Sequence, residues 1–208
     1  MKMFSMLLTA LMGIGLVQAA PASDFATDVV GLHTPNKTYN VIDINWSLQV
    51  NNTDTPWNLT VAGTIEDLFS NYSKVDPEGA AALNKSMHGD LQGRDVSSNP
   101  TTTLCNFLGD SASASRIAQG VSYLRGVPGK PSNGPGPGEC GRVSCSYNSA
   151  IWWCNDNRVT KVLDSFGNIA DGAQQILTLC DPNYHHASVN GQQFYDDGWN
   201  VIVRGASC

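Results

Sequence analysis

Charge is sparse in this sequence. Only 14% of its 208 residues are Asp, Glu, Lys or Arg, and 18 acidic residues outnumber 12 basic ones. No Lys/Arg cluster concentrates positive charge for phosphate groups, so the composition argues against a protein that binds nucleic acid. Solubility is expected to come from Asn, Ser, Thr and Gly, and from attached sugar.

Several motifs of catalysis and metal binding are missing as well. There is no C-x-x-C pair of the kind that binds zinc, and no G-x-S-x-G of a serine hydrolase. The Gly- and Pro-rich stretch GKPSNGPGPGE (129–139) lacks the G-K-[S/T] of a phosphate loop, and its prolines remove N–H donors. We therefore expect an irregular connector there, and no cofactor or metal.

Only one long apolar run occurs, at the start of the chain. Lys2 is the only charge in the first 23 residues, and the apolar run from about Met6 to Val17 ends in small residues. This layout is typical of a secretory signal peptide, and the run is shorter than the about 20 residues of a membrane span. We expect cleavage after Ala19, or alternatively after Ala20, and a secreted, extracellular protein. The other interpretation is a buried N-terminal helix.

Cysteine is absent from the first half of the chain. The six cysteines are Cys105, Cys140, Cys145, Cys154, Cys180 and Cys208. An even number in a secreted chain predicts three disulfides, although sequence alone cannot choose their pairing. One arrangement that the expected helices and strands allow joins Cys154 to Cys180, Cys140 to Cys208 and Cys105 to Cys145.

The first half carries glycosylation sequons instead. The pattern N-x-[S/T] occurs at Asn36, Asn45, Asn51, Asn58, Asn71 and Asn84. Asn99 does not qualify because Pro100 follows it. The pattern predicts a glycoprotein whose sugars lie on the N-terminal half.

Hydrophobic periodicity predicts both strands and helices. The stretch TYNVIDINWSLQV (38–50) alternates apolar and polar residues, and after the turn NNTDTP the stretch WNLTVAG (57–63) resumes the alternation. We expect a hairpin with Asn45 and Asn58 on its polar face. TLCNFL (103–108) is a short candidate strand that carries the first cysteine.

Three longer helices, a short helix at EGAAALNKSM (78–87) and a second hairpin are expected after the first hairpin. Thr64 is the expected N-cap of a helix that ends before Pro77. Residues 111–126 form a second helix, and residues 165–180 form a third with Ser165 as its cap. The closing hairpin turns at Asp197–Gly198.

These elements predict an α+β fold, a two-layer sandwich of an antiparallel sheet with helices on one face, stapled by disulfides. After the signal peptide (1–19), residues 20–104 form an N-terminal glycosylatable hairpin and helix region. Residues 105–208 form a disulfide-stabilised α/β domain. The N-terminal region either extends the sheet of that domain or forms a subdomain of its own.

The stretch CGRVSCSYNSAIWWCNDN (140–157) is the densest in chemistry. Trp152 and Trp153 are neighbours, so in a strand they point to opposite faces. Either both are covered, or the outer one is a contact residue, as tryptophans often are. The Asn155–Asn157 triplet is either a turn stabilised by its own side chains or a calcium loop, which would need more oxygen ligands.

This stretch also carries a resemblance. With YLRGVPGKP, GPGPGECG, FGNIADGAQQI, VNGQQF and WNVIVR, it resembles a functionally uncharacterised group of small secreted proteins from filamentous fungi. The resemblance covers about residues 115–208 and extends more loosely to the first half through GTIEDLF. It implies origin and secretion, and it does not imply an activity.

A more distant similarity is to smut killer toxins and necrosis-inducing fungal effectors. Those proteins pair a helix that ends in Cys with a closing V-x-G-Q-x-x-V-type strand in a two-layer α/β sandwich, and HASVNGQQF and NVIV match that layout. The other cysteine spacings depart from the toxin pattern, so a channel-blocking activity is not carried over.

Three functions follow as hypotheses. The first is a non-enzymatic secreted protein that binds a host or competitor protein, a membrane or a cell wall, in the manner of an effector or toxin. The second is a carbohydrate-binding module that stacks sugars on exposed aromatic residues. The third is a secreted hydrolase or nuclease built from a histidine with Glu139 and Arg142. The candidate binding residues are Tyr147, Trp152, Trp153, Trp199, His185 and His186.

Overall fold

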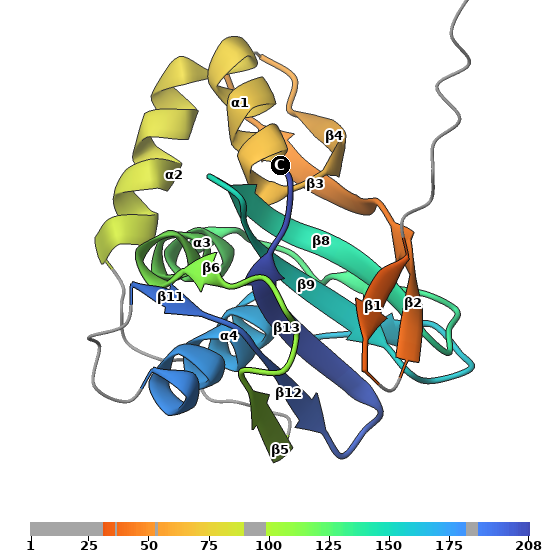
Figure 1. Ribbon diagram of the computed structural model, residues 1–208. Coiled ribbons are helices and arrows are strands. Elements are labelled where there is room, and N and C mark those ends of the chain that lie inside the picture. The colour runs from red at the N-terminus through yellow and green to blue at the C-terminus, as the bar shows by residue number, and fades with distance from the viewer. Residues whose placement is uncertain (1–30, 36, 53, 90–98, 182–186) are drawn as a thin grey trace, which may run out of the picture.

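The computed structural model describes residues 31–35, 37–52, 54–89, 99–181 and 187–208, which form the predicted α+β fold (Figure 1). The expected signal peptide lies outside the described residues. The helices are α1 (Ile65–Val75), α2 (Pro77–Gly89), α3 (Ala114–Gly126) and α4 (Gly167–Cys180).

One sheet organises the molecule. In spatial order its strands are β1 (Leu32–Thr34), β2 (Lys37–Ile42), β8 (Glu139–Ser146), β9 (Ser149–Asn155), β13 (Trp199–Gly205), β12 (Gly191–Tyr195) and β5 (Pro100–Cys105). All neighbours are antiparallel except β2 and β8, which are parallel. The first and second halves of the chain thus share this main sheet.

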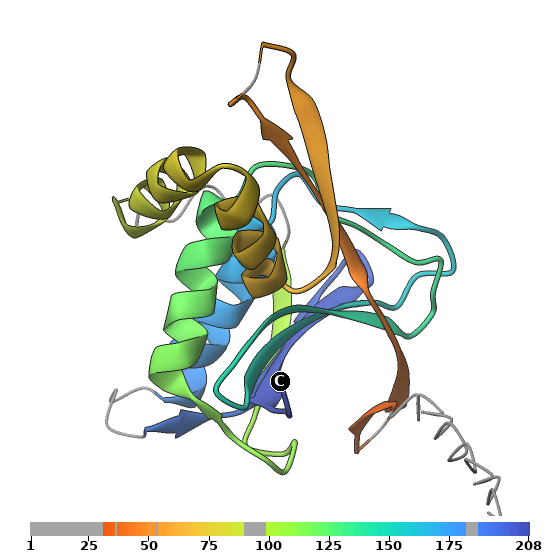
Figure 2. The same cartoon turned by 90° about the horizontal axis from the view of Figure 1, so that it is seen from above.

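Three two-stranded sheets complete the strands of the described chain. They pair β3 (Ile44–Val50) with β4 (Trp57–Gly63), β6 (Ala112–Ser113) with β11 (Ser188–Val189), and β7 (Ser132–Asn133) with β10 (Lys161–Val162). The β3–β4 pair is the predicted hairpin, and its turn end reaches away from the main sheet (Figure 2). Alternate residues of β3 are buried, as its sequence pattern predicts.

The α1–α2 corner follows from local capping. Thr64 and Asp67 form a reciprocal capping box at the start of α1, which confirms the predicted N-cap. Pro77 ends α1 but also begins α2, because the first position of a helix needs no backbone N–H. The carboxylate of Asp76 accepts the Gly79 N–H at 2.9 Å and so caps the second helix, which is longer than the short helix its sequence suggests.

A single carboxylate joins α1 to the main sheet. Strand β8 has a register shift between Arg142 and Ser144. There the Glu66 carboxylate accepts a hydrogen bond from the Ser144 hydroxyl at 2.6 Å and another from the Cys145 N–H at 3.0 Å. A bulge leaves backbone groups without a ladder partner, so this contact satisfies the strand where its regular pairing lapses.

The helices lie on one side of the main sheet, where α3 and α4 run side by side (Figure 2). The core between them is apolar and contains Ile117 and Leu124 of α3, Ile169 and Ile176 of α4, and Ile151, Trp153, Trp199 and Val201 of the sheet. Phe166, at the N-cap of α4, stacks on Trp46 of β3 with ring centroids 4.4 Å apart. The N-cap of α4 is therefore Phe166, and the prediction of Ser165 was wrong by one residue.

The other side of the sheet is concave. The Tyr39 hydroxyl of β2 lies 3.2 Å from the side-chain amide of Gln192 on β12, although three strands separate β2 from β12 in the sheet. Two side chains bridge that span only if the sheet curls toward them. A smaller apolar cluster fills the hollow, formed by Leu32, Tyr39, Leu108, Cys140, Cys145, Ala150, Trp152, Cys154 and Ile202.

The prediction of three disulfides is confirmed, but every predicted pair is wrong. The bonds join Cys105 to Cys180, Cys140 to Cys154 and Cys145 to Cys208. Cys140 and Cys154 face each other in register on β8 and β9. Helix α4 ends beside the edge strand β5 and not above β9, and the tail after β13 crosses back to β8. Both relations depend on strand order, which the cysteine spacing does not encode.

Candidate functional site

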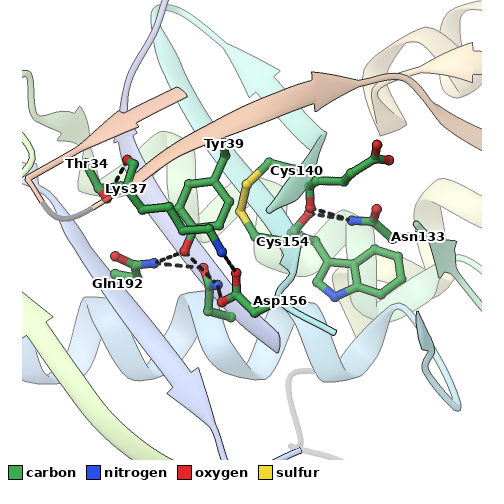
Figure 3. Close-up of a disulfide and its surroundings, with 11 residues drawn as sticks. Thr34, Lys37, Tyr39, Asn133, Cys140, Cys154, Asp156 and Gln192 are labelled. Carbon is green, nitrogen blue, oxygen red and sulfur yellow. Dashed lines mark hydrogen bonds and ion pairs between the residues drawn. A yellow bond between two sulfur atoms is a disulfide. The ribbon is translucent and has the colours of Figure 1, made fainter. Parts of the chain in front are cut away.

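A buried polar network lies in the concave face beside the Cys140–Cys154 disulfide (Figure 3). The side-chain amides of Gln192 and Asn200 each donate to the Tyr39 hydroxyl at 3.2 Å, and the Asn200 amide also reaches the Asp156 carboxylate at 2.7 Å. Lys37 forms an ion pair with Asp156 and lies 4.7 Å from the centroid of the Tyr39 ring. The network ties β2 to β12 and β13 and holds the curl of the sheet.

The network keeps Tyr39 protonated. Burial of the side chain, together with the nearby negative charge of Asp156, raises the pKa of Tyr39 to about 12. A phenol with such a pKa exchanges no proton near neutral pH. Tyr39 therefore serves as a structural hydrogen-bonding group and not as a general base.

A pocket of about 500 Å³ opens on the same face. It is bounded by β1, β2, β8, β9 and β13 and by the C-terminal tail. Its lining residues are Gly31, Leu32, His33, Val41, Ile42, Asp43, Asp110, Arg142, Trp152, Arg204, Gly205, Ala206 and Ser207. A volume of roughly 300–1,000 Å³ with apolar walls and a few polar groups is typical of a small-molecule site.

Strand register brings two arginines and a tryptophan to this pocket. Arg142 on β8 is directly opposite Trp152 on β9, and Trp152 is directly opposite Ile202 on β13. Arg204 lies two residues beyond Ile202, so its side chain leaves β13 on the same face. The pocket thus has a guanidinium on each side of an indole.

Backbone carbonyls hold both guanidinium groups. Arg142 Nη1 donates to the carbonyl of Ser207 at 2.7 Å, and Arg204 Nη1 donates to the carbonyl of His33 at 3.0 Å. The Arg142 guanidinium also lies 5.6 Å from the centroid of the Trp152 ring, within cation–π range. Within the described residues, neither arginine forms an ion pair with a carboxylate.

Acidic groups contribute to the pocket as well. Asp43, between β2 and β3, and Asp110, in the loop before β6, are exposed residues of its lining. The exposed His33 donates or accepts a hydrogen bond with the Thr38 hydroxyl at 2.9 Å. The pocket therefore combines two held cations with two solvated carboxylates.

The predicted aromatic residues do not form one surface. Trp153 and Trp199 are buried in the helix-side core at 0% and 1% exposure, which rules out the predicted sugar-stacking role for these two rings. Tyr195 stacks on Trp199 with ring centroids 3.8 Å apart. Trp152 is 7% exposed and lines the pocket. Thus both tryptophans of the β9 pair are covered, one on each face of the sheet.

Among the described members of the predicted binding set, Tyr147 is the exposed one, at 75%. It sits with Asn148 in the β8–β9 turn, and both residues have positive φ angles, as a type I′ turn requires. The Arg116 guanidinium lies 3.8 Å from the centroid of the Tyr147 ring. Tyr147 therefore stands apart from the pocket residues, at the tip of a hairpin.

The candidate hydrolase site is not assembled from its described members. Glu139 and Arg142 are three positions apart in the regular part of β8, so their side chains leave opposite faces of the strand. Glu139 lies 3.5 Å from the Asn40 side-chain amide, while Arg142 lines the pocket. The third component, His185 or His186, lies outside the described residues.

The Asn155–Asn157 triplet is a turn, as its simpler interpretation predicts. Asn155 Oδ1 accepts the Asn157 N–H at 2.9 Å, and the Asn155 amide donates to the carbonyls of Asn133 and Val159. These bonds fix the Asn155 side chain in the turn. Across the residues that the structure describes, no cluster of three or more His, Cys, Asp or Glu side chains could hold a metal ion.

The sequons fall on the outside of the molecule wherever they can be placed. Asn45, Asn51, Asn58 and Asn84 are exposed, and Asn71 is partly exposed; Asn36 lies outside the described residues. Asn45 and Asn58 share the outer face of the β3–β4 hairpin, opposite its buried side chains. Sugar at these two positions is sterically compatible with the fold.

Comparison of the chain with protein-family models, with curated proteins and with solved structures finds no match. None of the described helices is both long and apolar enough to cross a membrane.

Sequence reasoning missed most of this pocket. The sequence predicts Trp152 as a candidate binding residue and Arg142 as part of a hydrolase site, and it gives no reason to choose Arg204. The alternation of W-N-V-I-V-R places Arg204 on the same face as Ile202, so the direction of its side chain could have been derived. Its position beside Trp152 requires the pairing of β13 with β9, which the sequence does not give.

Proposed function

We propose that this protein is exported from a filamentous fungus and acts outside the cell by binding, in the manner of an effector or toxin, without catalysing a reaction. The concave-face pocket carries this proposal. It offers positioned groups that hold a ligand, namely two guanidiniums fixed by carbonyls and an indole, and its described lining contains no paired nucleophile and base.

Export is supported by independent features of the chain. The first residues have the layout of a signal peptide, and all six cysteines are paired in disulfides, which persist mainly in oxidising compartments. The sequons of the first half are accessible at the described positions. Sugar at the described sequons of the N-terminal half would leave the pocket open, since none of those asparagines lines it.

The test combines a turnover assay with a cell-binding assay. Protein secreted by a eukaryotic host, with its disulfides verified by mass spectrometry, would be incubated with RNA, chitin, β-glucan and casein. A fluorescent conjugate would then be titrated onto plant cells and onto competing fungal cells. We expect no turnover, and saturable binding to one cell type that excess unlabelled protein displaces. Turnover of any polymer, or binding that never saturates, would contradict the proposal.

A carbohydrate-binding role is the second candidate, because two aromatic side chains are exposed among the residues that the structure describes. Tyr147 is 75% exposed at the β8–β9 turn and Trp57 is 41% exposed at the start of β4. Sugar-binding modules stack pyranose rings on such side chains. Retention on insoluble chitin or glucan, lost in Trp57→Ala or Tyr147→Ala but not in Trp152→Phe, would favour this role over the pocket.

A further inference from the structure

We propose that the concave-face pocket binds a small organic monoanion, a carboxylate carried on a flat apolar body. This inference rests on the proposed function, since it names the ligand class of the same site. Three properties of the lining lead to it: the state of the two arginines, the apolar wall beside them, and the two carboxylates that accompany them.

The two arginines favour a ligand that carries a carboxylate. Each guanidinium has five N–H donors; carbonyls accept one from Arg142, and two from Arg204 through its bonds to His33 and Gly205. The remaining donors include the Nη2 group of each side chain. Because neither arginine has a carboxylate partner among the described residues, both keep their charge available for an anion. A carboxylate accepts two parallel N–H donors from such a planar fork.

The apolar lining of the pocket favours a ligand with a flat apolar body. Between the arginines lies the indole of Trp152, and Leu32, Val41, Ile42 and Ala206 complete an apolar lining. An aromatic ring stacks on an indole in an offset or tilted arrangement and gains more than its buried area alone. A bare inorganic anion would leave this lining uncovered and would gain nothing from it.

The acids limit the charge of the ligand. Asp43 and Asp110 belong to the lining and are exposed, so the pocket carries two acidic side chains as well as the two arginines. A ligand with several negative charges would place at least one of them near these carboxylates, and like-charge proximity disfavours such a partner. A monoanion satisfies the arginines without that penalty.

The experiment measures four probes by isothermal titration calorimetry on the intact mature protein: 2-naphthoate, its neutral analogue 2-naphthamide, acetate and inorganic phosphate. We expect saturable one-to-one binding of 2-naphthoate, at least tenfold weaker binding of the amide, and no heat of binding from acetate or phosphate at the same concentrations. Equal affinities for naphthoate and naphthamide, or no saturation with naphthoate, would overturn the inference.

Matched variants locate the binding. Arg142→Gln and Arg204→Gln should each weaken naphthoate binding at least tenfold and leave naphthamide binding unchanged. Arg116→Gln is the control, because it removes a guanidinium that lies over Tyr147 outside the pocket lining. Trp152→Leu should weaken both naphthoate and naphthamide, because it removes the flat wall that both share. If the pocket variants bind naphthoate as Arg116→Gln does, the site lies elsewhere and the proposal is wrong.

The fold of each variant is checked separately by near-UV circular dichroism and by the thermal midpoint. Arg142→Lys serves if Arg142→Gln fails to fold, because it keeps the charge and removes the planar fork; it should still weaken naphthoate binding. The outcome is separable from the proposed function. Saturable cell binding without naphthoate binding would contradict the proposed ligand class and leave the proposed function standing. Naphthoate binding together with turnover of a polymer would contradict the non-enzymatic function and leave the ligand class standing.

Discussion

The two faces of the main sheet share their strands but differ in what covers them. The helix side holds the larger apolar core, in which Trp153 and Trp199 are completely covered. The concave side holds a smaller cluster, a hydrogen-bonded network around Tyr39, two of the three disulfides and the pocket. We infer that the helix side of the sheet supplies most of the stability, whereas the concave side presents the ligand-binding groups.

The adjacent tryptophans of β9 should differ most in their effect on stability, because they lie on opposite faces of the sheet. Trp153→Ala would leave a large cavity in the helix-side core and should lower the free energy of unfolding by about 3–5 kcal/mol. Trp152→Ala should cost less than half as much, because its ring already borders a pocket. Urea unfolding followed by circular dichroism measures both changes. Equal losses would show that the two faces contribute equally to stability.

The disulfides of the two faces should also differ in how much they stabilise the fold. Cys105–Cys180 closes a separation of 75 residues and Cys140–Cys154 one of 14, so chain entropy predicts contributions of about 4 and about 3 kcal/mol. The double variants Cys105→Ala/Cys180→Ala and Cys140→Ala/Cys154→Ala test this order by their urea midpoints at equal m-values. A larger loss from the Cys140–Cys154 pair would mean that loop length does not set the order, and that the concave face depends on its disulfide more than the helix side depends on Cys105–Cys180.

The Tyr39 network should be visible in the alkaline range. The pKa of Tyr39 is raised to about 12, against about 10 in an unfolded chain, so its stabilising effect is complete below pH 10 and is lost as the pH rises through 12. Tyr39→Phe should therefore reduce the fall of the urea midpoint between pH 10 and pH 12. The comparison concerns slopes, because the variant also loses two hydrogen bonds at every pH.

Tyr195 provides the matched variant from the other face, since burial also raises its pKa. Tyr195→Phe should remove a second part of the alkaline decline. A Tyr39→Phe protein that follows the wild-type slope would show that the phenol is not held in its protonated form by the fold.

The smallest effect is expected on the outer hairpin. Asn45→Gln and Asn58→Gln remove two exposed sequons from the β3–β4 hairpin and should each lower the mass of the secreted protein by one glycan. The thermal midpoint should change little, because surface substitutions away from packed features usually alter stability by less than about 0.5 kcal/mol. An unchanged mass would mean that the sequon is not used.

Local features of the fold could be predicted from the sequence, and the relations between distant elements could not. The alternation around Trp46 and the N-cap at Thr64 depend on neighbouring residues, and both predictions are confirmed. The closing turn was predicted to have two residues, Asp197 and Gly198. In the structure three residues lie between the end of β12 at Tyr195 and the start of β13 at Trp199, and the last of them, Gly198, has a φ of +79°. That glycine fits a three-residue loop that ends in a left-handed residue.

The pocket and the disulfide pairing could not be predicted from local sequence patterns, and the reason is the same for both. Arg142 and Arg204 line the same face because their strands, β8 and β13, both pair with β9. Cys145 reaches Cys208 because the tail after β13 turns back across β9 to β8. Strand order in the sheet decides both. The parallel contact of β2 with β8, which places the first strands beside the pocket, is likewise set by tertiary packing.

The place of β13 has a consequence for the order of folding. This strand lies between β9 and β12 in the sheet, yet it follows both of them in the sequence, and Cys208 follows it in turn. Until β13 has been made and inserted, β9 and β12 have no strand between them to pair with, and Cys208 cannot reach Cys145. The main sheet and the disulfide between its tail and β8 therefore close as a late, joint event.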